Sequence, residues 1–237
     1  MAEQTLYIGI DLGTSGCRAI AIDLQRQVIA EARTTMPEPI QKGDGFEQDP
    51  HIWWQAVAKT LHQLLEQIPA DQVAAIAVDG TSSTLLLCDT DGNPIGPALM
   101  YNDARAVNEA ERMERIVPQQ SAAHGPSSGL AKLLWLHRSQ PHERVRHVCH
   151  QADWIAGQLT GHFDRSDANN CLKLGYDPIN RVWPDWIGHV GAFREWLPKV
   201  YLPGQPMGPI STETAQRFSL NPNVQLVAGT TDSTAAF

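Results

Sequence analysis

The stretch YIGIDLGTSGCRAIAIDLQRQVIAEA, residues 7–32, joins apolar runs through a Gly-Thr-Ser-Gly turn at 13–16. Apolar residues dominate 6–11 and recur densely over 17–24, so the pattern predicts a strand on each side of this turn. A third strand is expected over 28–32. The segment therefore predicts a meander at the start of the chain, and its first turn is too polar to serve packing alone.

The composition of this turn is typical of an anion site. Backbone N–H groups of a tight turn can converge on an anion, and small side chains let a phosphate come close. Asp11, at the end of the first strand, would lie beside that anion, which requires a cation such as Mg²⁺ between them. The turn matches neither GxxxxGK[ST] nor GxGxxG. A hairpin whose glycines only supply positive φ stays open as the alternative.

The composition bounds the class of protein. The chain has 237 residues, 42% hydrophobic and 19% charged, which suits a globular protein of one domain or two small ones. A net charge of -8, with 18 scattered Lys and Arg residues, argues against nucleic acid as a partner. No segment approaches the ~18 apolar residues of a membrane span. Four distant cysteines without a CxxC pair predict free thiols and a cytoplasmic protein.

Further elements follow from periodicity. Asp49 and Pro50 form a helix start, and apolar residues at helical spacing extend that helix over 50–68. Strands are expected at 73–78 and 84–88 and helices at 104–116, 129–138 and 152–160. A last strand is expected at 224–228. This mixture predicts one α/β layer architecture. The end at Phe237, within an apolar run, is the basis for expecting a fragment of a longer protein.

Six segments resemble a known family. DLGTSGCRA at 11–19 resembles the first phosphate-binding hairpin of the actin-like ATPase superfamily, and more narrowly of the FGGY carbohydrate kinases. The others continue in that family's order: FEQDPHIWWQAV at 46–57, VDGTSSTLLLCDTDGNPIGPALMYNDARA at 78–106, QADWIAGQLTG at 151–161, SDANNCLKLGYDPINRVW at 166–183 and VAGTTDSTAAF at 227–237. The resemblance covers essentially the whole chain.

This resemblance implies a fold and a domain. The fold would be an α/β, actin-like (ribonuclease H-like) domain with a mixed sheet flanked by helices. Residues 1–237 would form the N-terminal domain, which binds the sugar and carries the catalytic base. The C-terminal domain, which supplies most of the adenosine site, would lie outside this chain. The domain alone is expected to bind ATP weakly and to show negligible turnover.

The catalytic base implied by the resemblance is Asp232, in Gly-Thr-Thr-Asp-Ser. A sugar hydroxyl that attacks the γ-phosphate of ATP must lose its proton as the bond forms, and a carboxylate can accept it. The alternative is a loop aspartate that caps a helix from Ser233 onward.

The resemblance also assigns ATP and Mg²⁺ to the first hairpin. The residues implied to bind the phosphate are Gly13, Thr14, Ser15, Gly16 and Arg18. Asp11 would hold the waters of Mg²⁺ or a substrate hydroxyl. Its alternative role is that of a turn residue at the end of a strand.

The sugar site would be formed by two further segments. Ser82 and Ser83 stand where xylulokinase-like members carry Met-His, and two small hydroxyls resemble the ribulokinase-like branch. The alternative is that both hydroxyl groups only form hydrogen bonds within a Thr/Ser-rich loop. Asn102, Asp103 and Arg105 match the family's W-x-D-x-R, with Tyr in place of Trp; an ion pair that only holds the loop is the alternative.

Other polar and aromatic clusters are assigned structural roles. The two histidines of RHVCHQAD at 146–153 lack a second pair at zinc-site spacing, so a metal site is not expected there. The seven tryptophans are expected to pack in the core or between domains.

Together these features predict ATP-dependent phosphorylation of a sugar hydroxyl, with a ketopentose such as ribulose or xylulose as the small-molecule substrate. The alternative is a non-catalytic actin-like module that binds sugar or dimerises, and a homodimer is a possible assembly. Another actin-like ATPase, such as a chaperone, would not explain the six matching segments.

Overall fold

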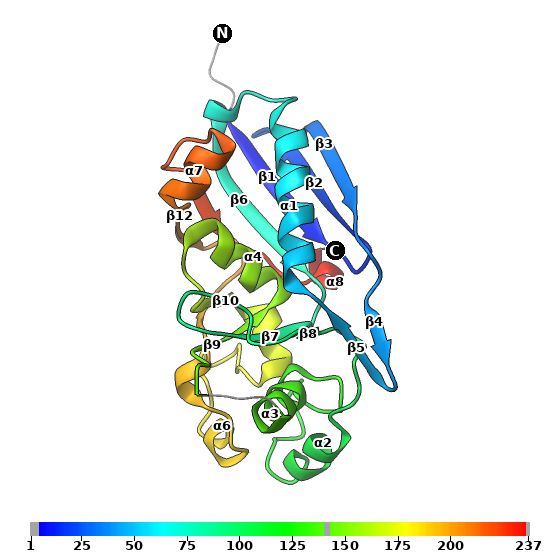
Figure 1. Cartoon of the computed structure of the whole chain (residues 1–237). Coiled ribbons are helices and arrows are strands. Elements are labelled where there is room, and N and C mark those ends of the chain that lie inside the picture. The colour runs from blue at the N-terminus through cyan, green and yellow to red at the C-terminus, as the bar shows by residue number, and fades with distance from the viewer. Residues whose placement is uncertain (1–4, 140–142, 236–237) are drawn as a thin grey trace.

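The computed structural model describes residues 5–139 and 143–235. Figure 1 shows an elongated molecule in which a large sheet with its helices forms one half and a smaller sheet with shorter helices forms the other. The end of the described chain lies in the middle of the molecule, near the junction of the two halves.

The predicted meander is confirmed. Strands β1 (Leu6–Leu12), β2 (Gly16–Ile22) and β3 (Val28–Thr35) pair antiparallel in order. Strand β2 ends before Leu24, because the Asp23 carboxylate accepts the N–H groups of two following residues at 2.9 Å and turns the chain.

Parallel strands extend this meander into a six-stranded mixed sheet of order β12-β13-β6-β1-β2-β3. Strands β6 (Val73–Gly80) and β13 (Gln225–Val227) run parallel to β1, while β12 (Pro206–Pro209) pairs antiparallel at the edge. Because parallel strands end on the same side, the carboxyl ends of β1, β6 and β13 share one edge of the sheet.

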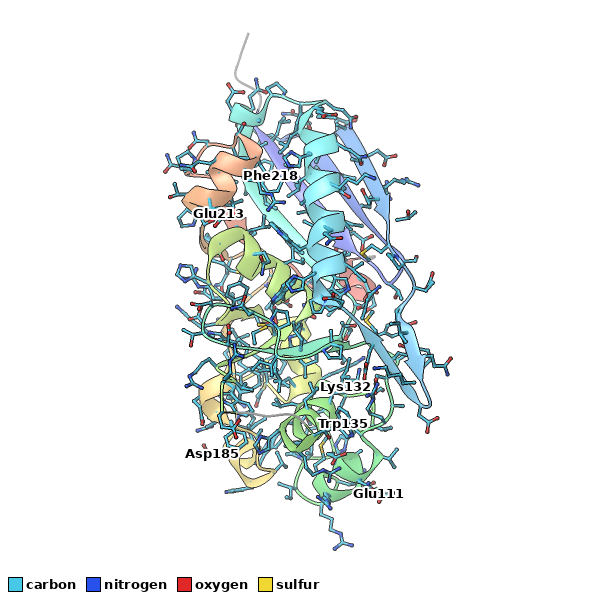
Figure 2. The ribbon with its side chains drawn as sticks, viewed as in Figure 1. Glu111, Lys132, Trp135, Asp185, Glu213 and Phe218 are labelled. Carbon is cyan, nitrogen blue, oxygen red and sulfur yellow. The ribbon has the colours of Figure 1, made fainter. Side chains whose placement is uncertain are left out.

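Helices α1 (Pro50–Leu65), α4 (Gln151–Thr160) and α7 (Thr212–Phe218) pack beside this sheet (Figure 1). The predicted start of α1 is confirmed, since the Asp49 side chain accepts the His51 N–H at 3.0 Å. Phe218 lies between α7 and α1 (Figure 2) and meets the Trp54 ring at a centroid distance of 6.3 Å. Within the described residues, no helix combines the length and apolar character that crossing a membrane requires.

A second sheet has the order β4-β5-β8-β7-β9. Its strands are β4 (Ile40–Lys42), β5 (Gly45–Gln48), β7 (Leu85–Cys88), β8 (Ala98–Leu99) and β9 (His147–His150). Side chains of β7 alternate between the main hydrophobic core and a second core. Burial on both faces explains why β7 reads as a continuous apolar run.

The sequence predicted one α/β layer architecture, and the structure adds a second hydrophobic core beside it. This second core is formed with helices α2 (Val107–Met113) and α3 (Gly129–Ser139). Figure 2 labels Lys132 and Trp135 on α3 and Glu111 at the surface of α2, and Trp135 packs against this core as a partly buried side chain. The remaining elements are η1 (Ala70–Gln72), β10 (Arg165–Asp167), α5 (Ala168–Cys171), η2 (Leu172–Leu174), α6 (Trp186–His189), η3 (Arg194–Trp196), β11 (Lys199–Tyr201) and α8 (Asp232–Ala235).

Two structural expectations are confirmed. All four cysteines are free and buried. The seven tryptophans are buried or pack as partly buried side chains against the hydrophobic clusters. Trp53 and Trp154 are fully buried and meet edge to face at 6.3 Å.

Candidate active site

The shared edge of the parallel strands brings three aspartates into one pocket of about 400 Å³. Asp11 lies near the end of β1, Asp79 lies near the end of β6, and Asp232 follows the loop after β13. Arg18 on β2 and Gly229 also line this pocket. Asp11 and Asp232, which the sequence analysis assigned to the Mg²⁺ or substrate site and to the base, therefore line one pocket.

Asp79 is the residue that the sequence analysis missed. Its position on β6 is opposite Asp11 on β1, and one of its oxygens, Oδ1, is buried with no hydrogen-bond partner in the described part of the chain. Burial, followed by the charge and the hydrogen bond of Asp11 and the charge of Asp232, raises the pKa of Asp79 from 3.8 to about 7. The available signal was the Asp79-Gly80 pair at the end of an apolar run, but such a pair is equally typical of an ordinary turn.

The hairpin turn differs from a simple glycine turn. Neither Gly13 nor Gly16 has a positive φ, so the alternative that these glycines only supply positive φ is wrong. A Cβ at Gly16 would lie 2.9 Å from the Thr34 carbonyl oxygen, which shows that β3 approaches too closely for a side chain. The turn is closed by a 3.0 Å hydrogen bond from Gly13 N–H to Gly16 O.

The tip of this hairpin carries unused donors. Within residues 5–139 and 143–235, the N–H groups of Thr14 and Ser15 have no hydrogen-bond partner. Ser15 is exposed and Thr14 is half-buried. Two adjacent free N–H groups at a polar turn suit an anion.

A groove of about 350 Å³ runs along the hairpin and is lined by Asp11, Arg18 and Arg33 among others. Both arginines contact Glu31 on β3, Arg18 at 2.6 Å and Arg33 at 3.5 Å. Asp11 and Arg18 line this groove and the pocket with Asp232, so the two hollows adjoin at these residues. The donor set of the groove, two arginines and free N–H groups, fits a phosphate.

A metal ion would depend on Asp11 and on the ligands that arrive with a nucleotide. Among the described residues, no group of three or more His, Cys, Asp or Glu side chains is arranged to hold a metal ion. Asp11 is exposed beside the hairpin. This suits Mg²⁺, which keeps several waters and takes one or two carboxylates plus phosphate oxygens. The two histidines of β9 form no metal site; His150 Nδ1 contacts Asp153 Oδ2 at 2.7 Å.

The loop that carries Asp232 is held from two sides. A Cβ at Gly229 would overlap the Val78 carbonyl oxygen, so only glycine lets this loop lie against β6. On the other side, α5 contacts Thr230, whose Oγ1 accepts the Asn169 side-chain N–H at 2.9 Å and whose carbonyl accepts that of Asn170 at 3.3 Å. These contacts fix the start of α8 beside the pocket.

Asp232 is not the N-cap of α8, so the helix-cap alternative is wrong. The carbonyl of Thr231 accepts the N–H groups of Thr234 and Ala235, so Thr231 occupies the capping position. The Asp232 carboxylate meets only the adjacent Ser233 N–H, at 2.7 Å. Its side chain is exposed and lines the pocket with Asp11 and Asp79.

Asp11 lines this pocket, whereas the other residues predicted to bind sugar lie on two neighbouring loops outside it. Ser82 is half-buried in the loop that follows β6. Ser83 is 1% exposed with φ at 66°, and its Oγ has no hydrogen-bond partner in the described chain. Asn102 is exposed in the turn after β8. Contacts between these residues and a sugar stay predictions.

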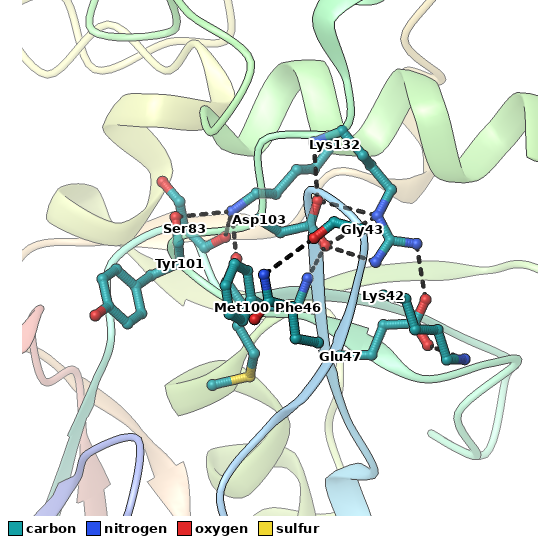
Figure 3. A network of polar contacts seen from close by, with 11 residues as sticks. Lys42, Gly43, Phe46, Glu47, Ser83, Met100, Tyr101, Asp103 and Lys132 are labelled. Carbon is teal, nitrogen blue, oxygen red and sulfur yellow. Dashed lines mark hydrogen bonds and ion pairs between the residues drawn. The ribbon is translucent and has the colours of Figure 1, made fainter.

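Asp103 and Arg105 form the ion pair that was weighed as the alternative. Asp103 is fully buried; its Oδ2 lies 2.8 Å from Arg105 Nη2 and also accepts the Phe46 N–H at 2.8 Å. Arg105 Nη1 reaches Glu47 Oε1 at 2.7 Å, as Figure 3 shows. Neither Asp103 nor Arg105 lines the pocket of Asp232. Their contacts instead connect the loop after β8 to β5.

The sheet order and the three acids at its carboxyl ends place the chain in the actin-like, ribonuclease H-like class of α/β domains. The model for the FGGY family of carbohydrate kinases, N-terminal domain, matches residues 6–237. The chain therefore belongs to the FGGY family of carbohydrate kinases.

Individual proteins agree with this placement. Xylulose kinase of Escherichia coli K12 is 31% identical over 243 residues, which are 97% of this chain and 49% of that protein. The structure of a xylulose kinase from Rhodospirillum rubrum shares the fold with a TM-score of 0.87 at 23% identity, over 98% of this chain and 50% of that one. A Plasmodium falciparum glycerol kinase with ADP shares it with a TM-score of 0.85 at 15% identity, over 98% and 49%. The chain thus spans about half the length of its relatives.

Proposed function

We propose that this chain is the sugar-binding and catalytic part of an ATP-dependent carbohydrate kinase. The single observation that carries the proposal is the pocket in which Asp11, Asp79 and Asp232 meet beside the hairpin with free N–H groups. A base and an anion site that adjoin are what phosphoryl transfer to a hydroxyl requires.

In this mechanism, Asp232 accepts the proton of the attacking sugar hydroxyl, because its carboxylate is exposed to the pocket and engages only one neighbouring N–H. At the tip of the turn from Gly13 to Gly16, Thr14 and Ser15 would donate their free N–H groups to the γ-phosphate. Arg18 adds positive charge on the same side. ATP with Mg²⁺, when bound near Asp11, supplies the phosphoryl group and neutralises its charge.

The proposed substrate is a ketopentose such as ribulose or xylulose. Support comes from the size of the pocket, about 400 Å³, and from relatives named xylulose kinase. Ser82 and Ser83, beyond the end of β6, would contact the sugar with small polar side chains, and Asn102 would approach it from the neighbouring loop. We also propose a cytosolic location, which the free cysteines support. A homodimer stays a prediction.

The test is a phosphorylation assay of the full-length protein with Mg-ATP and a panel of ribulose, xylulose, glycerol and gluconate. The highest kcat/KM is expected for a ketopentose. Calorimetry with the same sugars runs in parallel. Sugar binding without any ADP production would contradict the kinase and favour the alternative, a non-catalytic sugar-binding module.

A further inference from the structure

Lys132 on α3 is a fully buried lysine without a carboxylate partner among the described residues. Its Nζ donates to three backbone carbonyl oxygens: Ser83 at 2.9 Å, Met100 at 2.7 Å and Tyr101 at 3.1 Å (Figure 3). An ammonium group has three N–H donors, so all of them are used. The lysine therefore joins two backbone segments through three hydrogen bonds.

The surroundings of the Lys132 side chain are unfavourable for a charged group. Lys132 lies in the first turn of α3, where the helix dipole disfavours a cation, and its helix neighbours Leu133 and Leu136 are buried apolar side chains. Burial lowers the pKa of Lys132 from 10.5 to about 7, although the charge of Asp103 acts in the opposite direction. An apolar residue would suit this position better if packing were its only task.

The two segments that Lys132 connects are the loops of the proposed sugar site. One follows β6 and carries Ser82 and Ser83; the other follows β8 and carries Asn102. The first loop is strained, since Ser83 has a φ of 66°. The loops are separated in sequence, so their relative position depends on contacts such as those of Lys132.

The second loop is also held on its far side. Asp103 accepts the Phe46 N–H at 2.8 Å, and Arg105 bridges Asp103 to Glu47 on β5. Figure 3 shows the contacts of Lys132 together with those of Asp103 and Glu47. The ion pairs tie the loop to the second sheet, whereas only Lys132 in this network reaches the loop after β6.

We propose that Lys132 is a positioning residue for the sugar, which holds the loops after β6 and β8 at the separation that sugar binding requires. The inference rests on the proposed function. Lys132 acts through the backbone of Ser83 and Tyr101 and touches no substrate itself.

The test uses the full-length enzyme with Lys132→Met, which keeps the volume and removes the donors. Lys59→Met, at an exposed lysine of α1, is the matched control. The KM for the ketopentose is expected to rise roughly tenfold in Lys132→Met, as for the loss of one or two hydrogen bonds to a charged donor. The KM for Mg-ATP is expected to stay within about twofold, and Lys59→Met should match the wild type in both.

A purely structural lysine would lower thermal stability and the folded fraction but leave the sugar KM of the folded enzyme unchanged, and that result overturns the inference. If Lys132→Met does not fold, Lys132→Gln, which keeps two N–H donors, replaces it with an intermediate KM expected. Failure of both variants to fold also overturns the inference. An inactive wild-type enzyme instead overturns the proposed function, and the inference with it.

Discussion

Asp11 and Asp79 lie at paired positions on the neighbouring parallel strands β1 and β6, and both side chains line the same pocket. Two carboxylates this close do not both ionise readily, because the second negative charge is repelled by the first. Burial adds to this effect and raises the pKa of Asp79 to about 7. Asp79 therefore keeps its proton up to near-neutral pH.

Asp79→Asn is expected to change the pH dependence of stability. The folded protein keeps a proton on Asp79 up to about pH 7, whereas the unfolded chain releases it near 3.8. The wild type thus loses stability as pH rises from about 4 to 7, and the loss is complete above 7. Asn carries no such penalty, so at pH 8 it should be more stable by about 1–2 kcal/mol, a value reduced by solvent screening of a half-buried pair.

Urea unfolding of the full-length protein at pH 4.5 and pH 8, followed by tryptophan fluorescence, measures this difference. Asp71→Asn, at an exposed aspartate of η1, is the matched control and should shift neither value. Equal stability of Asp79→Asn and wild type at both pH values would contradict the raised pKa of Asp79.

Asp232→Asn is expected to lower kcat for sugar phosphorylation by roughly 10²–10⁴-fold, the usual contribution of a general base. The amide is isosteric, so the dissociation constant for the sugar, measured by calorimetry, should stay within about threefold. Asp185→Asn is the control, since this side chain is 96% exposed and lies at the far surface (Figure 2). Undiminished turnover in Asp232→Asn rules out its role as base.

Gly16→Ala is expected to weaken ATP binding. A Cβ at this position would lie 2.9 Å from Thr34 O, so β2 and β3 must separate and the hairpin tip must move. We expect the KM for Mg-ATP to rise roughly five- to tenfold, as for the loss of about 1 kcal/mol of phosphate contacts, with a smaller effect on the sugar KM. Gly188→Ala has open space for its Cβ and serves as control. An unchanged KM for Mg-ATP would separate the hairpin from the nucleotide.

Asn169→Ala is expected to loosen the loop that carries Asp232. The substitution removes the 2.9 Å hydrogen bond to Thr230 Oγ1 and leaves the contacts of Asn170 in place. A roughly three- to tenfold fall in kcat, at nearly constant sugar KM, is expected from misplacing a base by a fraction of an ångström. Steady-state kinetics measures it beside Asn108→Ala, an exposed position on α2. A kcat equal to wild type would show that the hydrogen bond of Asn169 does not position Asp232.

Local patterns predicted the elements that carry strong periodicity or caps. The meander, the start of α1 at Asp49 and the buried strand β7 were all expected from neighbouring residues. Strands β4, β5, β8 and β9 were not expected, because each has only two to four residues and none of them is a continuous apolar run of four like β7. The second core beneath them was missed for the same reason.

By itself, the sequence determined the α/β class, the polar hairpin turn and the acids to examine, because strand patterns, turn residues and family segments are local properties of the chain. Only the tertiary structure decided that Asp79 joins Asp11 and Asp232, since parallel pairing of β1 and β6 sets that register. It also decided that Lys132 is buried between two loops, although its neighbours in sequence form an ordinary apolar helix. Pairing and burial depend on contacts between distant segments, and these contacts exist only once the chain has folded.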